Sequence, residues 1–118
     1  MSDRIKEFRS FRERMNERII EAGNLDMKRF FALDSRIYEE GALPTQTKEL
    51  LGLVASLVMR CDDCISYHLI RCKEDGVSNE QMMETLSVGL IVGGSIVIPH
   101  LRRAVDLLDE INEDGPQG

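Results

Sequence analysis

The sequence is short of aromatic residues and of basic charge. It has no tryptophan, two tyrosines and four phenylalanines, so it offers few platforms on which nucleic-acid bases could stack. Its 21 acidic residues outnumber its 15 basic residues, which gives a net charge of −6. Because an acidic surface repels a phosphate backbone, we expect no nucleic acid among the partners of this protein.

Long hydrophobic runs are also lacking. The most apolar stretch, residues 86–98, contains three glycines and two serines and is shorter than the roughly 20 residues that a membrane-spanning helix needs. The first twenty residues are charged throughout and lack the apolar core of a secretion signal. We therefore expect a cytoplasmic protein that has no membrane partner.

The scarcity of proline and the absence of alternating β-branched residues favour an all-α fold. There are three prolines in 118 residues, a length typical of a single domain. Apolar residues recur at three- and four-residue steps, which predicts a single all-α domain over residues 1–118 with about six helices. N-terminal helices are expected over about residues 3–40 and a motif-bearing helical core over about residues 43–112.

Several helix ends carry recognisable signals. Asp26 is a plausible N-cap for the second helix, and Asp62 or Asp63 for the fourth. Ser78 and Gln81 form a capping-box pattern for the fifth helix. The second helix is expected to bury one apolar side, which comprises Met27, Phe30, Phe31, Ile37 and Tyr38.

The candidate reactive side chains of the sequence are concentrated in residues 61–68. Cys61 and Cys64 are three positions apart, and His68 follows Cys64 by four positions. The odd total of three cysteines excludes a fully paired disulfide framework within one chain. In a reducing compartment, a close cysteine pair is more often redox-active or metal-binding than structural. The start of a helix lowers the pKa of a thiol, whereas the intervening Asp62 and Asp63 act in the opposite direction.

His68 and Glu49 are candidate partners of this cysteine pair. On a helix, Cys64 and His68 share one face about one turn apart, and histidine is well suited to transfer protons near neutral pH. Glu49 lies on the preceding helix, twelve residues before Cys61. If the next helix folds back antiparallel, Glu49 approaches His68 and orients it, which gives the nucleophile, base and orienting group of covalent catalysis.

The order Glu49, Cys61, Cys64 and His68 resembles the signature of alkylhydroperoxidase D-like proteins, which belong to the carboxymuconolactone decarboxylase superfamily. The likeness extends over about residues 43–109, from the helix opening at Lys48-Glu49-Leu50 to beyond Gly93-Gly94. The peroxidase type carries a second histidine at the position of Asp63 and is a longer chain with a duplicated helical unit.

This resemblance implies an alkylhydroperoxidase D-like helical bundle that assembles into homo-oligomers, commonly trimers or hexamers. It implies a thiol-dependent oxidoreductase that reduces hydroperoxides or disulfides by cycling Cys61 and Cys64 between dithiol and disulfide, with His68 and Glu49 as proton relay. A dithiol partner, such as a lipoyl- or thioredoxin-type protein, would restore the thiols. No cofactor and no metal are expected.

Other interpretations of the same residues remain open. The protein is alternatively a redox-responsive interaction protein without turnover, or a decarboxylase-like enzyme on a small acid that Arg60, Arg71 or Arg102 anchors. Cys61, Cys64, His68 and Cys72 are four candidate zinc ligands, but Cys72 lies about 12 Å along the helix from Cys64, too far for one tetrahedral site. Zinc bridging two chains stays an alternative, and the order in which Cys61 and Cys64 react is open.

Overall fold

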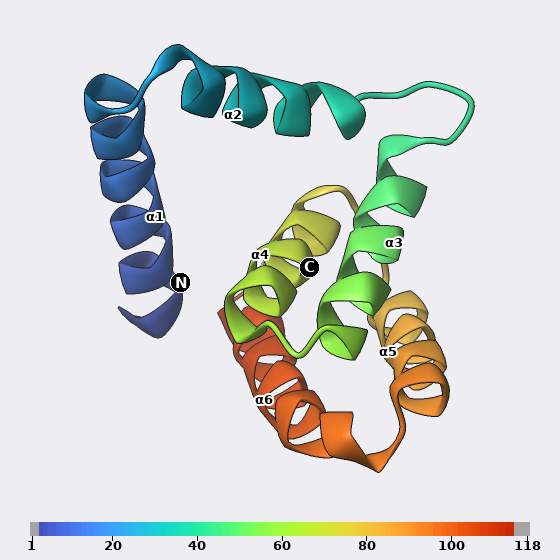
Figure 1. Cartoon of the computed structure of the whole chain (residues 1–118). Coiled ribbons are helices and arrows are strands. Elements are labelled where there is room, and N and C mark those ends of the chain that lie inside the picture. Colours follow the sequence, from blue (N-terminus) through green and yellow to red (C-terminus); the bar gives the residue numbers. More distant parts are fainter. Residues whose placement is uncertain (1–2, 115–118) are drawn as a thin grey trace. The chain divides into compact units, whose positions relative to one another are not determined.

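The computed structural model describes residues 3–114, which form α-helices joined by short loops (Figure 1). The predicted all-α fold is confirmed. The elements are α1 (Asp3–Ala22), α2 (Leu25–Ile37), α3 (Thr45–Val58), α4 (Asp62–Glu74), α5 (Asn79–Gly93), the 3-10 turn η1 (Ser95–Val97) and α6 (Ile98–Asp114). No helix within these residues combines the length and the apolar character that are needed to cross a bilayer.

The chain divides into two compact units, Met1–Glu39 and Glu40–Gly118. The first unit holds α1 and α2, and the second holds α3 to α6 with the candidate site. In the second unit α3 packs against both α4 and α5, while α4 also packs against α6 (Figure 1). The cysteine motif therefore begins at a junction between two helices that share one core.

The core of the second unit consists of aliphatic side chains with almost no exposed surface. Its fully buried members are Leu53, Leu57, Ile65, Leu69, Met82, Leu86 and Val97. Gly89 of α5 allows α3 to approach closely, because a Cβ atom at this position would lie 2.8 Å from Cδ2 of Leu57. This packing fixes α3, and with it the side chains that α3 presents to α4.

The second helix differs from its prediction in both its ends and its environment. It begins at Leu25, and Asn24 is its N-cap, since the Asn24 side chain accepts a hydrogen bond from the backbone N–H of Met27 at 3.0 Å. Asp26 instead lies in the first turn. The helix ends at Ile37 rather than near Gly41.

The apolar side that was expected to be buried on α2 is largely exposed. Met27, Phe30 and Ile37 are 47%, 69% and 56% exposed, and no residue of α2 is fully buried. Periodicity identified an apolar face, but it could not show whether this chain alone covers that face.

The predicted boundaries of the other helices are close to the observed ones. Ser78 and Gln81 form the predicted capping box of α5, with both reciprocal hydrogen bonds present. On α3 the buried face is formed by Glu49, Leu53, Ser56 and Leu57. Leu50, Val54 and Val58, which lie beside these residues on the helix, are only half-buried.

Candidate active site

The turn between α3 and α4 places the first cysteine. The backbone N–H of Arg60 donates to the carbonyl of Leu57 at 3.0 Å, and that of Cys61 donates to the carbonyl of Ser56 at 3.1 Å. These two bonds form a Schellman motif with Arg60 in the left-handed position, at a φ of 61°. Glycine usually occupies this position because a Cβ atom costs energy there. Arg60 adopts this left-handed conformation in the short turn between α3 and α4, whose two ends are fixed by the helices.

Cys61 is the N-cap of α4, a role that the sequence had suggested for Asp62 or Asp63. Its Sγ atom accepts a hydrogen bond from the backbone N–H of Cys64 at 3.3 Å. Asp62 and Asp63 lie in the first turn of the helix instead. The Cys61 sulfur therefore lies at the positive end of the helix dipole and satisfies one backbone N–H of the first turn.

The three cysteines are free thiols in distinct environments. Cys64 is exposed, Cys61 is half-buried and Cys72 is fully buried. Burial, together with the charges of Glu49 and Asp75, raises the pKa of Cys72 to about 12. Cys72 is therefore a protonated core residue at neutral pH, and the reactive candidates are Cys61 and Cys64.

Mild oxidation is expected to link Cys61 to Cys64 and to leave Cys72 reduced. The Sγ atom of Cys61 already lies against the backbone of Cys64, whereas the Cys72 thiol is shielded and un-ionised. Peptide mapping of the oxidised protein under non-reducing conditions measures the pairing. A dominant Cys64–Cys72 link would contradict this prediction, and alkylation of Cys72 only after denaturation would support it.

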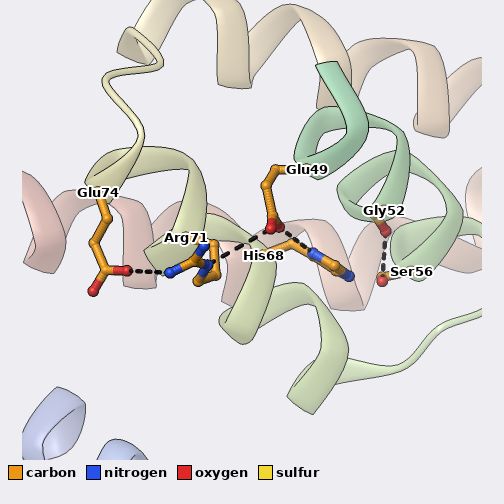
Figure 2. A network of polar contacts seen from close by, with 6 residues as sticks. All are labelled: Glu49, Gly52, Ser56, His68, Arg71 and Glu74. Atoms are coloured by element: carbon orange, nitrogen blue, oxygen red, sulfur yellow. Dashed lines mark hydrogen bonds and ion pairs between the residues drawn. The ribbon is translucent and has the colours of Figure 1, made fainter. Parts of the chain in front are cut away.

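Glu49 and His68 meet in the core between α3 and α4, as the antiparallel arrangement predicted. Figure 2 shows the Glu49 carboxylate directed at the His68 ring, with Nδ1 of His68 at 2.8 Å from Oε1 of Glu49. Glu49 is 1% exposed and His68 is 8% exposed. Because a carboxylate can only accept a hydrogen bond, Nδ1 of His68 donates it, and Nε2 is the ring nitrogen that Glu49 does not contact.

Arg71 completes the surroundings of Glu49, and the sequence analysis did not assign it this role. Its Nε atom lies 3.6 Å from Oε2 of Glu49, and its Nη1 atom lies 3.2 Å from Oε1 of Glu74 (Figure 2). Burial lowers the pKa of Arg71, but Tyr67 and the neighbouring carboxylates raise it, and the net direction is upward. Arg71 is thus a cation at neutral pH that lies beside the buried Glu49 carboxylate, and its role as the substrate anchor of a decarboxylase stays an alternative.

The His68 ring has further neighbours. The ring of Tyr67 packs edge-on against it, with centroids 5.1 Å apart and an interplanar angle of 71°. In Figure 2 the His68 ring extends from Glu49 toward Ser56, whose hydroxyl donates to the carbonyl of Gly52 at 2.6 Å. Glu49 and Tyr67 thus both contact the His68 ring.

A second polar cluster lies at the first turn of α4. Asp62 contacts His100 and Arg103 of α6 at 2.8 Å and 2.9 Å. Neither His100 nor Arg103 was among the site residues predicted from the sequence. Their spacing of three residues puts them on one face of α6, but nothing in the sequence indicated that Asp62, about 40 residues earlier, lies opposite.

The polar residues do not form a metal-binding group. Within residues 3–114 no set of three or more histidine, cysteine, aspartate or glutamate side chains is arranged to hold a metal ion. The chemistry that the described residues support is that of two thiols, a histidine and the charges around them.

Comparison with known proteins finds a matching family model and a similar bacterial protein. The model of the carboxymuconolactone decarboxylase family matches residues 25–107. A protein of Paracoccus denitrificans described as "Uncharacterized protein 4 in cox locus" is 32% identical over 83 residues, which are 70% of this chain and 75% of that protein.

Solved structures agree over almost the whole chain. A crystal structure of a Thermotoga maritima protein shares 55% identity with a TM-score of 0.92, covering 96% of this chain and 99% of that chain. Another crystal structure from Thermotoga maritima, with 53% identity, a TM-score of 0.88 and coverage of 95% and 97%, is described as a carboxymuconolactone decarboxylase family protein with a suggested part in the antioxidative response. A Legionella pneumophila family member, at 24% identity, a TM-score of 0.78 and coverage of 92% and 97%, shares the fold.

Proposed function

Because the chain belongs to the carboxymuconolactone decarboxylase family, we propose that it is a thiol-dependent oxidoreductase that reduces hydroperoxides through Cys61 and Cys64. The contact of the buried Glu49–His68 pair, one helical turn from an exposed Cys64, carries this proposal. The description of the similar Thermotoga maritima protein, which mentions an antioxidative response, supports the same class of chemistry.

The first step takes place at Cys64, which is the more exposed thiol of the pair. Its thiolate attacks the terminal oxygen of the hydroperoxide, the O–O bond breaks, and Cys64 becomes a sulfenic acid. The departing alkoxide takes a proton and leaves as an alcohol. His68 shares a helix face with Cys64 and supplies this proton from Nε2, while Glu49 stabilises the charged imidazole.

Cys61 then resolves the intermediate. Its thiolate attacks the Cys64 sulfur, hydroxide leaves and is protonated to water, and an intramolecular disulfide forms. Cys61 is half-buried and its Sγ atom lies at the N-cap of α4, against the backbone N–H of Cys64, so the resolving sulfur is already next to the residue that it attacks.

The same geometry suits reduction by an external dithiol of the lipoyl or thioredoxin type. The donor thiolate attacks the exposed Cys64 sulfur, and Cys61 departs as a thiolate. In the dithiol form the Cys61 sulfur lies at the start of α4 and accepts a hydrogen bond from the Cys64 N–H. The donor's second thiol then releases the mixed disulfide, which returns both cysteines to the dithiol state.

Substitution of each cysteine tests the order of these steps. Cys61→Ser is expected to accumulate a sulfenic acid at Cys64 after one equivalent of hydroperoxide, because nothing resolves it. Cys64→Ser is expected to form none and to lose peroxide consumption. Trapping with dimedone followed by mass spectrometry detects the sulfenic acid, and Cys72→Ala, which removes a buried thiol, is the matched control. A dimedone adduct at Cys61 in the Cys64→Ser variant would reverse the assignment.

Turnover with a dithiol donor distinguishes the proposed function from its alternatives. Sustained hydroperoxide consumption with reduced dihydrolipoyl protein or thioredoxin is the expected result. Oxidation of the cysteines without turnover would instead indicate a redox-responsive interaction protein. Activity on a small acid that survives loss of both thiols would indicate a decarboxylase-like enzyme.

A further inference from the structure

Asp62 connects the cysteine motif to α6. Its Oδ1 atom lies 2.8 Å from Nδ1 of His100, and its Oδ2 atom lies 2.9 Å from Nε of Arg103. Asp62 is the residue that follows Cys61, in the first turn of α4. The two oxygens of one carboxylate thus join the start of the cysteine-bearing helix to two side chains about 40 positions further along the chain.

The negative charge of Asp62 would by itself disfavour the reactive thiolate form of the two cysteines. Negative charges next to a thiol disfavour its thiolate form, and the motif has two, Asp62 and Asp63, between Cys61 and Cys64. The helix start acts in the opposite direction. The balance between these effects decides how much thiolate is present at neutral pH, and thiolate is the nucleophilic form.

Arg103 brings a permanent positive charge against Asp62. Partial burial raises the pKa of Asp62, but the hydrogen bond from His100 and the charge of Arg103 outweigh it and hold that pKa below its usual value. Asp62 is therefore ionised at neutral pH, and its charge is matched by a cation at contact distance. Nδ1 of His100 donates the proton of its hydrogen bond to Asp62, since the ionised carboxylate can only accept.

The other charged side chains near Cys61 and Cys64 differ from Asp62 in their surroundings. Asp63 is exposed to solvent, which screens its charge. Glu49, which faces α4 from α3, is matched by Arg71. Arg60 precedes Cys61 and is exposed. Among the acidic side chains near the motif, Asp62 is therefore the one whose effect depends on α6.

We propose that His100 and Arg103 are positioning residues for the Cys61–Cys64 pair, which hold Asp62 against α6 and neutralise a charge that would otherwise oppose thiolate formation. This inference rests on the proposed thiol chemistry, but it concerns a property of the reduced thiols themselves. The positive charge of Arg103 reaches the first turn of α4 from α6, a distant part of the chain.

Removal of the Arg103 charge tests this assignment. Arg103→Ala is expected to raise the pKa of the reactive thiols by roughly half to one unit, which slows their alkylation by iodoacetamide at pH 7 by about 3- to 10-fold. Arg103→Lys, which keeps the charge, is expected to restore most of the rate. The rates are measured between pH 5 and 10 by mass spectrometry of the peptide that starts at Cys61. Arg102→Ala is the matched control, because it removes an exposed arginine of α6 next in sequence.

A second variant tests whether Asp62 mediates the effect. Asp62→Asn combined with Arg103→Ala removes both charges, and the thiol pKa is expected to return close to that of the unaltered protein. An unchanged thiol pKa in Arg103→Ala would overturn the proposal, as would a double variant that keeps the full shift. Arg103 is 54% exposed, so these variants are expected to fold, and helical circular dichroism verifies it.

The measurement of the thiol pKa tests the positioning role separately from the proposed turnover of hydroperoxide. If the protein consumes no hydroperoxide but Arg103→Ala still raises the thiol pKa, the proposed function fails and the positioning role stands. If turnover is found and the thiol pKa does not respond to Arg103, the positioning role fails alone.

Discussion

His68→Gln and Glu49→Gln are each expected to lower the rate of hydroperoxide consumption by about 10²- to 10⁴-fold, the usual contribution of a proton-transfer group. The glutamine at position 68 cannot transfer a proton. Glutamine at position 49 still accepts a hydrogen bond from His68 but no longer stabilises its charged form. Stopped-flow measurement of peroxide consumption with excess dithiol donor gives the rates.

The double variant shows whether the two residues act as one unit. Since Glu49 acts only through His68, to which it is bonded at 2.8 Å, the double variant is expected to be no slower than the slower single variant. Glu74→Gln is the matched control, because it also converts a carboxylate on this network to an amide but contacts Arg71 rather than His68. Fully additive losses would mean that Glu49 and His68 work independently.

The helices of this protein were predictable because local signals determine their ends. The capping box at Ser78 and the glycine at 76, whose φ is 83°, mark boundaries in the sequence itself. The α3–α4 boundary was less clear, because Arg60 occupies a position where glycine is usual and a cysteine replaces the expected aspartate cap. In that turn the contacts of two helices override local preference.

The helical periodicity of the sequence predicted only part of the candidate site. Glu49 and His68 could be paired because one helix must fold back on the next, and their contact is confirmed, while their catalytic roles stay predictions. The pairing of Asp62 with His100 and Arg103 depends on the packing of α4 against α6, which involves a separation of about 40 residues. No spacing rule connects residues so far apart in sequence.

Self-association is expected because neither compact unit buries all of its own apolar side chains. On α2, Met27, Phe30, Leu33 and Ile37 fall on one face, at angles set by about 3.6 residues per turn, and Phe30 is 69% exposed. On α5, Ile91 is 82% exposed. An apolar helix face that is exposed to solvent is a typical site of association, and burial between copies in closed symmetry is the usual solution. We propose a homo-oligomer, a trimer or a hexamer as the family resemblance implies.

The mass in solution tests this proposal directly. Light scattering coupled to size exclusion at micromolar concentration is expected to give about 40 kDa for a trimer or twice that for a hexamer, against 13.4 kDa for one chain. Phe30→Asp places a charge in the apolar face of α2 and is expected to shift the protein toward smaller species, because burying an unpaired charge is costly. Ala32→Asp adds the same charge on the opposite side of the same helix and is expected to leave the mass unchanged. A monomeric unaltered protein, or equal dissociation by both variants, would show that this face does not mediate assembly.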